Sequence, residues 1–246
     1  MAQIIFEHVT KKFQKEAVLQ DISFEVEKGE FVFIIGKSGA GKSTLLNLIR
    51  KQEEVTSGKI TVEGRRVDTM KRNRIPAHRR RLGIISPEVG LLRDRSVYDN
   101  IYLAILATGN TNGRMHTMIM KLLGLVGLAG KYRAFPDELS GGEQARALVA
   151  RALAVEPEIL LADEPTANLD ADSAWDLMQL LAELNYRGMT ILVASHAREL
   201  VTIMKRRCIT LASGKIATDE KNSIYNQKAI DRARERKVLR ELRRKR

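Results

Sequence analysis

A glycine-rich loop constrains the fold of this chain more than any other stretch. The sequence GKSGAGKST, residues 36–44, follows the apolar run FVFII and leads into TLLNLI, where apolar residues recur at helical spacing. A strand, a glycine loop and a helix in this order predict a phosphate-binding loop. The glycines let backbone N–H groups close around phosphates, and the helix N-terminus adds its positive end. A flexible Gly/Ser turn is the alternative, and the flanking strand and helix argue against it.

Two side chains of the loop have distinct expected roles. Lys42 is expected to reach the β- and γ-phosphates, and the Ser43 hydroxyl is expected to ligate Mg²⁺. The expected nucleotide-binding residues of the loop are Gly36, Lys37, Ser38, Gly39, Ala40, Gly41, Lys42, Ser43 and Thr44.

Two acidic residues end an apolar strand in ILLADE, residues 159–164. A buried strand that delivers Asp163 to its C-terminal end places a carboxylate where Mg²⁺ and its waters sit. Glu164 points another way and is expected to polarise the attacking water as general base. An acidic pair alone would indicate a solvated strand end, but the phosphate-binding loop favours the catalytic interpretation.

A third motif, LSGGEQ, begins a helix at residues 139–144. Ser140 and Glu143 have the spacing of a capping box, which is the purely structural interpretation. A capping box does not account for Gly141 and Gly142, which weaken the first helical turn. Bare N–H groups at a helix start bind anions, so we predict a second phosphate-binding helix end. Two such sites in one chain suggest a nucleotide clamped between two copies.

The order of strands and helices predicts one α/β domain. Strand patterns such as ISFEVE near the N-terminus are followed by helices alternating with the apolar strands ILLAD, TILVAS and CITLA. This alternation is typical of a mainly parallel sheet with helices around it. We predict one domain over residues 1–225, a helical insert over residues 90–155, and a separate basic tail over residues 226–246.

Charge narrows the class of partner. The 246 residues carry a formal net charge of +12, and residues 231–246 hold nine Lys/Arg against three Asp/Glu. This excess favours an anionic neighbour: nucleotide, nucleic acid or a membrane surface. Neither KRNRIPAHRRR nor the tail interleaves aromatic residues for base stacking, so we expect no nucleic-acid partner. The tail is expected to meet anionic lipid headgroups, and a merely solvated tail is the alternative.

Cysteine usage and hydropathy set the expected compartment. The single cysteine, Cys208, excludes an internal disulfide and suits a reducing cytoplasm. The N-terminal residues carry charges unlike a signal peptide, and no apolar run of about 18 residues predicts a membrane span.

The motifs GKSGAGKST, LSGGEQ, ILLADEP, ANLD and ASH, in this order, resemble those of the ATP-binding cassette (ABC) ATPases from about residue 5 to 217. The resemblance implies a RecA-like core with N-terminal antiparallel strands and an inserted helical subdomain. It also implies ATP and Mg²⁺ as cofactors, and a head-to-tail homodimer in which Ser140–Gly142 of one copy completes the other copy's site. It gives Phe13 to the adenine ring, Asp170 to the dimer interface and His196 to the γ-phosphate. Alone, Phe13 would be assigned to core packing and His196 to a structural role.

The segments RNRIPAHRRRLG and LLRDRSVYDNI narrow the resemblance to the FtsE family of cell-division ATPases. That family works at the cytoplasmic face of the cell membrane, beneath the integral membrane protein FtsX, and controls cell-wall hydrolases. The alternative is an ATPase subunit of an exporter or a lipoprotein-release system, because such proteins share with this chain segments that are similar to LADEPTANLD.

Two positions depart from the ABC pattern. Pro87 in GIISPEVGLL aligns with a glutamine that touches Mg²⁺ and the lytic water, and Ala197 follows the histidine where an acid is common. Proline offers no side-chain oxygen and locks φ, although Glu88 has an oxygen that can swing in. The resulting hypothesis is a regulatory ATP clamp that closes on ATP but hydrolyses it slowly.

Overall fold

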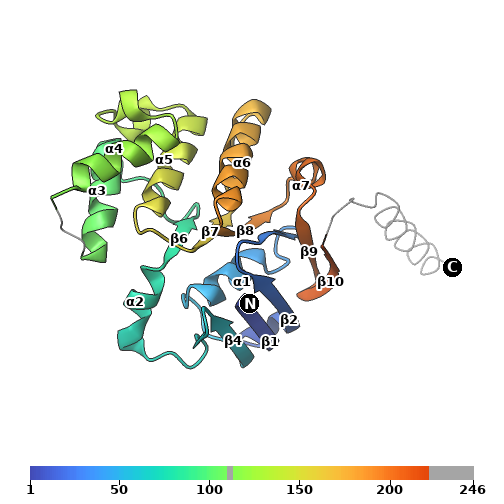
Figure 1. The fold of residues 1–246 in the computed structure, drawn as a ribbon. Helices are drawn as coiled ribbons and strands as arrows, with labels where there is room; N and C mark the ends of the chain where they lie inside the picture. The colour runs from blue at the N-terminus through green and yellow to red at the C-terminus, as the bar shows by residue number, and fades with distance from the viewer. Residues whose placement is uncertain (110–112, 222–246) are drawn as a thin grey trace.

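The computed structural model describes residues 1–109 and 113–221. It consists of two β-sheets and the helices that connect and cover their strands (Figure 1). The basic tail predicted over residues 226–246, and its boundary at residue 225, lie outside the described residues. The sheets are one of four strands and one of six. Within the described ranges, no helix combines the length and apolar character needed to cross a bilayer.

The four-stranded sheet is antiparallel and has the order β2-β1-β4-β5. Its long strands β1 (Ala2–Phe13) and β2 (Glu16–Glu27) pair with Phe6 opposite Phe24, whose rings stack at 4.7 Å between centroids. β4 (Ser57–Val62) and the short β5 (Arg65–Arg66) complete it. This is the N-terminal antiparallel layer expected from the ABC resemblance.

The six-stranded sheet has the order β10-β9-β3-β8-β7-β6, and β3 (Phe31–Ile35) lies between β9 and β8. All five residues of β3 are buried, because both faces of the sheet are covered. Phe31, Phe33 and Ile35 pack against the helical layer, whereas Val32 and Ile34 face the antiparallel sheet. The other strands are β6 (Leu82–Ile85), β7 (Ile159–Asp163), β8 (Thr190–Ser195), β9 (Arg207–Ala212) and β10 (Lys215–Glu220); only β10 is antiparallel to its neighbour.

Three helices between β6 and β7 form a layer of their own, although these two strands are adjacent in the sheet. Figure 1 shows this helical layer at one end of the molecule, away from the antiparallel sheet. It corresponds to the helical insert expected over residues 90–155. Its elements are α3 (Val97–Thr108), α4 (Met115–Leu125), α5 (Gly141–Leu153) and the short helices η2 (Ala129–Lys131) and η3 (Pro136–Glu138).

The remaining helices connect the strands. They are α1 (Lys42–Ile49), η1 (Arg72–Arg74), α2 (Ile75–Arg79), α6 (Ala171–Tyr186) and α7 (Arg198–Met204). The mixed α/β architecture with one antiparallel and one mainly parallel sheet confirms the predicted fold class.

Residues of α2 cap the C-terminal end of α1. Nε2 of His78 lies 2.8 Å from the carbonyl of Ile49, and Arg79 donates to the carbonyls of Arg50 and Lys51 at 3.1 and 2.8 Å. A helix leaves its last carbonyls unpaired, and donors from α2 satisfy them. Arg79 also brings a positive charge to the negative end of the helix dipole, whereas burial lowers the pKa of His78. The basic stretch therefore has a structural role that its composition did not reveal.

A buried arginine joins the edge of the large sheet to the N-terminal strands. Arg207 on β9 is 8% exposed, and it makes two bonds to the carboxylate of Asp219, at 2.8 and 2.7 Å. The same guanidinium bonds Glu30 at 3.0 Å and the carbonyl of Glu25 at 2.7 Å. The hydrogen bonds that Arg207 donates to Asp219 and Glu30 raise the pKa of its guanidinium, so the group stays charged.

We expect Arg207→Ala to lower the free energy of unfolding by about 3 kcal/mol, because it leaves two half-buried carboxylates without their partner. The control is Arg187→Ala, which removes an exposed pair with Glu183 on α6 and should cost about 0.5 kcal/mol or less. Urea denaturation measures both. Equal losses in the two variants would contradict the structural role of Arg207.

Candidate functional site

The loop between β3 and α1 has the conformation that its glycines allow. Gly41 has φ of 99°, a region that favours glycine, and a Cβ there would lie 2.6 Å from Leu19. A Cβ on Gly36 would lie 2.6 Å from the carbonyl oxygen of Leu211. These two positions therefore need glycine for reasons within the chain, and the loop leads directly into the first turn of α1.

Lys42 lies at the base of this loop and is 8% exposed. Its ammonium group donates to the carbonyl of Gly36 at 3.0 Å and lies 3.4 Å from Oε1 of Glu164. The loop motif and the acidic strand end, 120 residues apart in sequence, thus meet at one cation.

Glu164 and His196 form the second contact of the site. Oε2 of Glu164 is 2.8 Å from Nδ1 of His196, and it also accepts from the backbone N–H of His196 at 3.3 Å. Glu164 has φ of 46°, just beyond the end of β7, and its own N–H donates to the carbonyl of Ala194 on β8. Adjacent parallel strands bring the two side chains together at the carboxyl edge of the sheet, where such folds bind ligands.

Asp163 has a buried carboxylate oxygen whose negative charge a bound cation would compensate. Its Oδ1 is buried and has no hydrogen-bond partner among the described residues. Burial raises the pKa of Asp163, while a hydrogen bond from Ser43 and the charge of Lys42 act in the opposite direction. A desolvated carboxylate oxygen next to a serine hydroxyl fits a hard cation such as Mg²⁺.

Lys42, Glu164 and His196 line one cavity of about 610 Å³, whereas Asp163 lies outside its lining. Its size is in the range of small-molecule sites. Val18, from β2, lies in the wall and was missed by the sequence reasoning, because a valine in a strand pattern carries no chemical signal. The lining residues are Val18, Ser38, Gly39, Gly41, Lys42, Ser43, Thr44, Glu164 and His196.

The LSGGEQ residues lie outside the lining of this cavity. Ser140 caps α5, and the full capping box with Glu143 is formed, at 3.3 and 2.9 Å. Gly142 has a packing reason as well, since a Cβ there would lie 2.8 Å from Oγ of Ser173 on α6. Lys131 pairs with Glu143 at 2.6 Å, and the hydrogen bond from Lys131 lowers the pKa of Glu143.

Phe13 and Asp170 also lie outside the lining. Phe13 is 42% exposed and the ammonium of Lys11 sits 4.4 Å from its ring centroid, so the core-packing alternative is wrong. Asp170 caps α6, where it accepts from the N–H and the hydroxyl of Ser173 at 2.8 and 2.7 Å. The hydrogen bonds from Ser173 lower the pKa of Asp170.

Pro87 occupies a tight turn directly after β6. The N–H of Val89 donates to the carbonyl of Ser86 at 3.0 Å, which makes Pro87 the second residue of a four-residue turn. Proline is favoured there because its fixed φ suits the turn and the position needs no N–H. The proline therefore ends the strand, as its lack of a donor predicts.

Two arginines hold the loop after this turn from opposite sides. The carboxylate of Glu88 is 2.8 Å from Arg50, which is 5% exposed and lies at the end of α1. Arg151 on α5 donates to the carbonyl of Gly90 at 2.7 Å and also to that of Val89. The loop thus connects the α1 end of the sheet domain to the helical layer, and the Glu88 carboxylate is engaged by Arg50.

A sequence profile of the ABC transporter family matches residues 19–167. Together with relatives about 40% identical over most of its length, this match shows that the chain belongs to the ABC transporter family, whose general activity is ATP hydrolysis. Among these relatives is the cell division ATP-binding protein FtsE of Mycobacterium tuberculosis, 40% identical over 224 residues, covering 90% of this chain and 97% of that protein. FtsE of Escherichia coli K12 is 40% identical over 86% of this chain and 96% of its own.

Solved structures agree with this assignment. A dimeric ATP-binding cassette in a post-hydrolysis state, bound to ADP and phosphate, is 31% identical with a TM-score of 0.79. It covers 89% of this chain and 98% of its own. A dimeric bacterial ABC transporter cassette has the same TM-score at 30% identity and the same coverage.

We expect Asp163→Asn to raise the free energy of unfolding of the nucleotide-free protein. Burial raises the pKa of Asp163, so the charged form is disfavoured in the folded state at neutral pH, and a neutral side chain removes that cost. Urea denaturation without nucleotide measures the change. The matched control is Asp176→Asn on the exposed face of α6, which should stay within about 0.5 kcal/mol of wild type. A clear loss of stability in Asp163→Asn would contradict the desolvation argument.

Proposed function

We propose that this chain is the ATP-hydrolysing subunit of an FtsE-type cell-division complex, acting with an integral membrane partner that resembles FtsX. The observation that carries the proposal is the convergence of Lys42, Glu164 and His196 on one cavity behind a phosphate-binding loop. The choice of FtsE over other ABC proteins is supported by relatives of that name, which align over nearly their whole length.

The loop is proposed to bind the phosphates of ATP through its backbone N–H groups and the start of α1. Lys42 is close to that position, and its bonds to loop carbonyls are available for exchange with phosphate oxygens. The proposed nucleotide-binding residues are Gly36, Lys37, Ser38, Gly39, Ala40, Gly41, Lys42, Ser43 and Thr44, with Phe13 for the adenine ring.

Glu164 is proposed as the general base that takes a proton from the attacking water. His196 holds this carboxylate from one side and Lys42 from the other, so its orientation is fixed before substrate binds. We propose that His196 also contacts the γ-phosphate. Its Nδ1 is bound to Glu164, so its second ring nitrogen, Nε2, would make this contact.

Ser43 and Asp163 would hold Mg²⁺. The buried, unpaired Oδ1 of Asp163 supports this assignment. When bound, the ion would neutralise charge on the β- and γ-phosphates and thereby favour displacement.

Two copies are proposed to close on two nucleotides, each completed by the partner's α5 N-terminus. Ser140, Gly141, Gly142 and Glu143 begin this helix outside the cavity of their own copy, which is consistent with a role toward a second copy. The dimeric state of similar cassettes supports the same arrangement. Asp170, at the start of the neighbouring α6, is proposed to lie at this interface.

The proposed location is the cytoplasmic face of the cell membrane, where closing of the dimer would move the membrane partner. The basic tail, outside the described residues, is proposed to add contacts to anionic headgroups, at roughly 1 kcal/mol per Lys/Arg near the surface.

A second candidate function is a slow-turnover ATP clamp. The observation that favours it is the state of the loop after β6, where Pro87 supplies no oxygen and Glu88 is bound by Arg50. Ala197, in place of an acid after the histidine, adds to this. Such a protein would bind ATP and close, while its membrane partner controls hydrolysis.

We expect Glu164→Gln to abolish steady-state ATP hydrolysis, since loss of a general base typically costs 10² to 10⁴-fold. Pro87→Gln should exceed wild type by on the order of 10²-fold if the missing contact alone limits the rate. Both variants are measured with and without the reconstituted FtsX-like partner.

Each outcome separates the candidates. If the wild-type rate equals that of Pro87→Gln and is well above that of Glu164→Gln, the slow-turnover clamp is contradicted and the protein is an ordinary ATPase. A wild-type rate indistinguishable from Glu164→Gln, with or without partner, would contradict the hydrolytic function.

A further inference from the structure

A second cavity, of about 580 Å³, is lined by residues that lie apart in sequence from those of the cavity proposed to hold ATP. One continuous segment encloses it, from β5 through the following turn and η1 to α2. Residues 65–81 hold eight Lys/Arg and one Asp, a surplus of seven that is more than half of the chain's net charge of +12. The lining residues are Arg65, Arg66, Thr69, Met70, Lys71, Arg74, Ala77 and His78.

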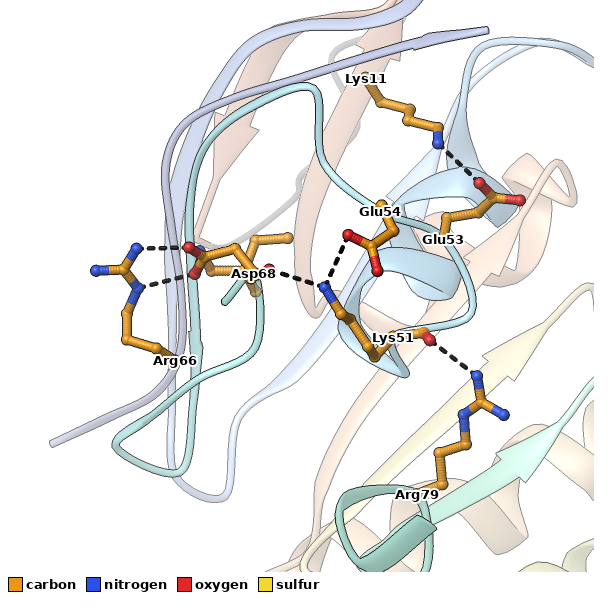
Figure 2. Close-up of polar contacts among 8 residues, drawn as sticks. Lys11, Lys51, Glu53, Glu54, Arg66, Asp68 and Arg79 are labelled. Carbon is orange, nitrogen blue, oxygen red and sulfur yellow. Dashed lines mark hydrogen bonds and ion pairs between the residues drawn. The ribbon is translucent and has the colours of Figure 1, made fainter. Parts of the chain in front are cut away.

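The nearest carboxylate does not neutralise this cavity. Arg66 donates two bonds to the carboxylate of Asp68 (Figure 2). Asp68 also accepts from the N–H of Ile60 at 3.0 Å. The side chain of Asp68 is only 5% exposed, so its carboxylate is already engaged within the chain. Across the part of the chain that the structure describes, no carboxylate forms an ion pair with Arg65, Lys71 or Arg74.

Hydrogen bonds join the segment around the cavity to the end of α1. Figure 2 shows Lys51 reaching the carbonyl of Asp68, at 2.8 Å, and Arg79 reaching the carbonyl of Lys51. Lys51 is 5% exposed, and His78 is 3% exposed and bonded to the carbonyl of Ile49. Because a carbonyl only accepts, Nε2 of His78 carries the proton in this bond. The segment that lines the cavity is therefore fixed to the end of α1. Arg65, Lys71 and Arg74 take no part in these bonds.

We propose that this cavity is a binding site for a phosphate group, with Arg65, Lys71 and Arg74 as its ligands and Thr69 as an additional donor. Guanidinium groups bind phosphate oxygens through paired N–H donors, and three cations without a carboxylate partner in the described part of the chain match the negative charge of a phosphate group. The phosphate can belong to a soluble phosphorylated molecule or to the headgroup of an anionic lipid. The first turn of α1 lines the cavity proposed to hold ATP, and His78 of the second cavity bonds the carbonyl of Ile49 at the other end of the same helix.

Nucleic acid fits this cavity less well than a lone phosphate. The lining includes no aromatic ring on which a base can stack, and the only apolar residues are Met70 and Ala77. The inference does not depend on the proposed cell-division function, because it concerns the charge and shape of one segment.

The test is calorimetric titration of pyrophosphate into the full chain with its ATP cavity saturated by ADP. We expect Arg65→Gln/Arg74→Gln to weaken binding at least about tenfold, since each lost charged hydrogen bond is worth more than the 1.4 kcal/mol of a tenfold change. The matched control is Arg72→Gln/Arg80→Gln, which removes the same charge from the same segment without touching the lining, and should stay within about twofold. All four positions are exposed, so folding should be preserved; thermal denaturation checks this.

Flotation with vesicles of phosphatidylglycerol and of phosphatidylcholine distinguishes the source. A loss specific to Arg65→Gln/Arg74→Gln with pyrophosphate supports a soluble ligand, and the same loss with phosphatidylglycerol vesicles alone supports a headgroup. Equal losses in both double variants, or no binding of either probe, would overturn the proposal. Binding of a twelve-nucleotide single strand that is tighter than pyrophosphate and lost in the same double variant would also overturn it, in favour of nucleic acid.

Discussion

The central position of β3 is the constraint on which the rest of the structure depends. A strand buried on both faces must have its N–H and C=O groups paired on both sides, and β9 and β8 supply those partners. Its end is therefore fixed in the middle of the sheet, and the loop that follows meets the ends of β7 and β8. Lys42 contacts Glu164, and Glu164 contacts His196, because three neighbouring strands end at one edge. The cavity proposed to hold ATP is a consequence of strand order.

Helix α1 joins this arrangement to the basic stretch and to the loop after β6. Its first turn belongs to the phosphate-binding loop, and its last carbonyls are capped by His78 and Arg79. Arg50, at the same end, binds Glu88 in the loop after β6, and Arg151 holds that loop from the helical layer. The loop connecting the two layers is therefore tied to both, and Pro87 lies in the turn at its start.

Much of the fold and the site was predictable, because strongly patterned features carry their own physical reason. The glycine loop and the acidic strand end are recognisable because residue type and position in the strand or turn agree. The capping box is confirmed at Ser140 and Glu143, where the spacing of these residues predicts it. Other features depend on contacts between distant segments. Val18 enters the cavity wall, Arg50 meets Glu88, and Phe13 stays exposed beneath Lys11 only because of tertiary packing. The basic stretch likewise conceals which arginines are used in pairing and which are free to bind a ligand.

The central claim is that two copies close around ATP held by this site. Sedimentation velocity of Glu164→Gln with and without Mg²⁺ and ATP tests it most directly, since a protein that binds but cannot hydrolyse accumulates in the closed state. We expect a monomer without nucleotide and a dimer with it, and we expect Ser140→Arg in the same background to prevent the dimer by blocking the start of α5. A protein that stays monomeric at saturating ATP, or a dimer unaffected by Ser140→Arg, would contradict the account.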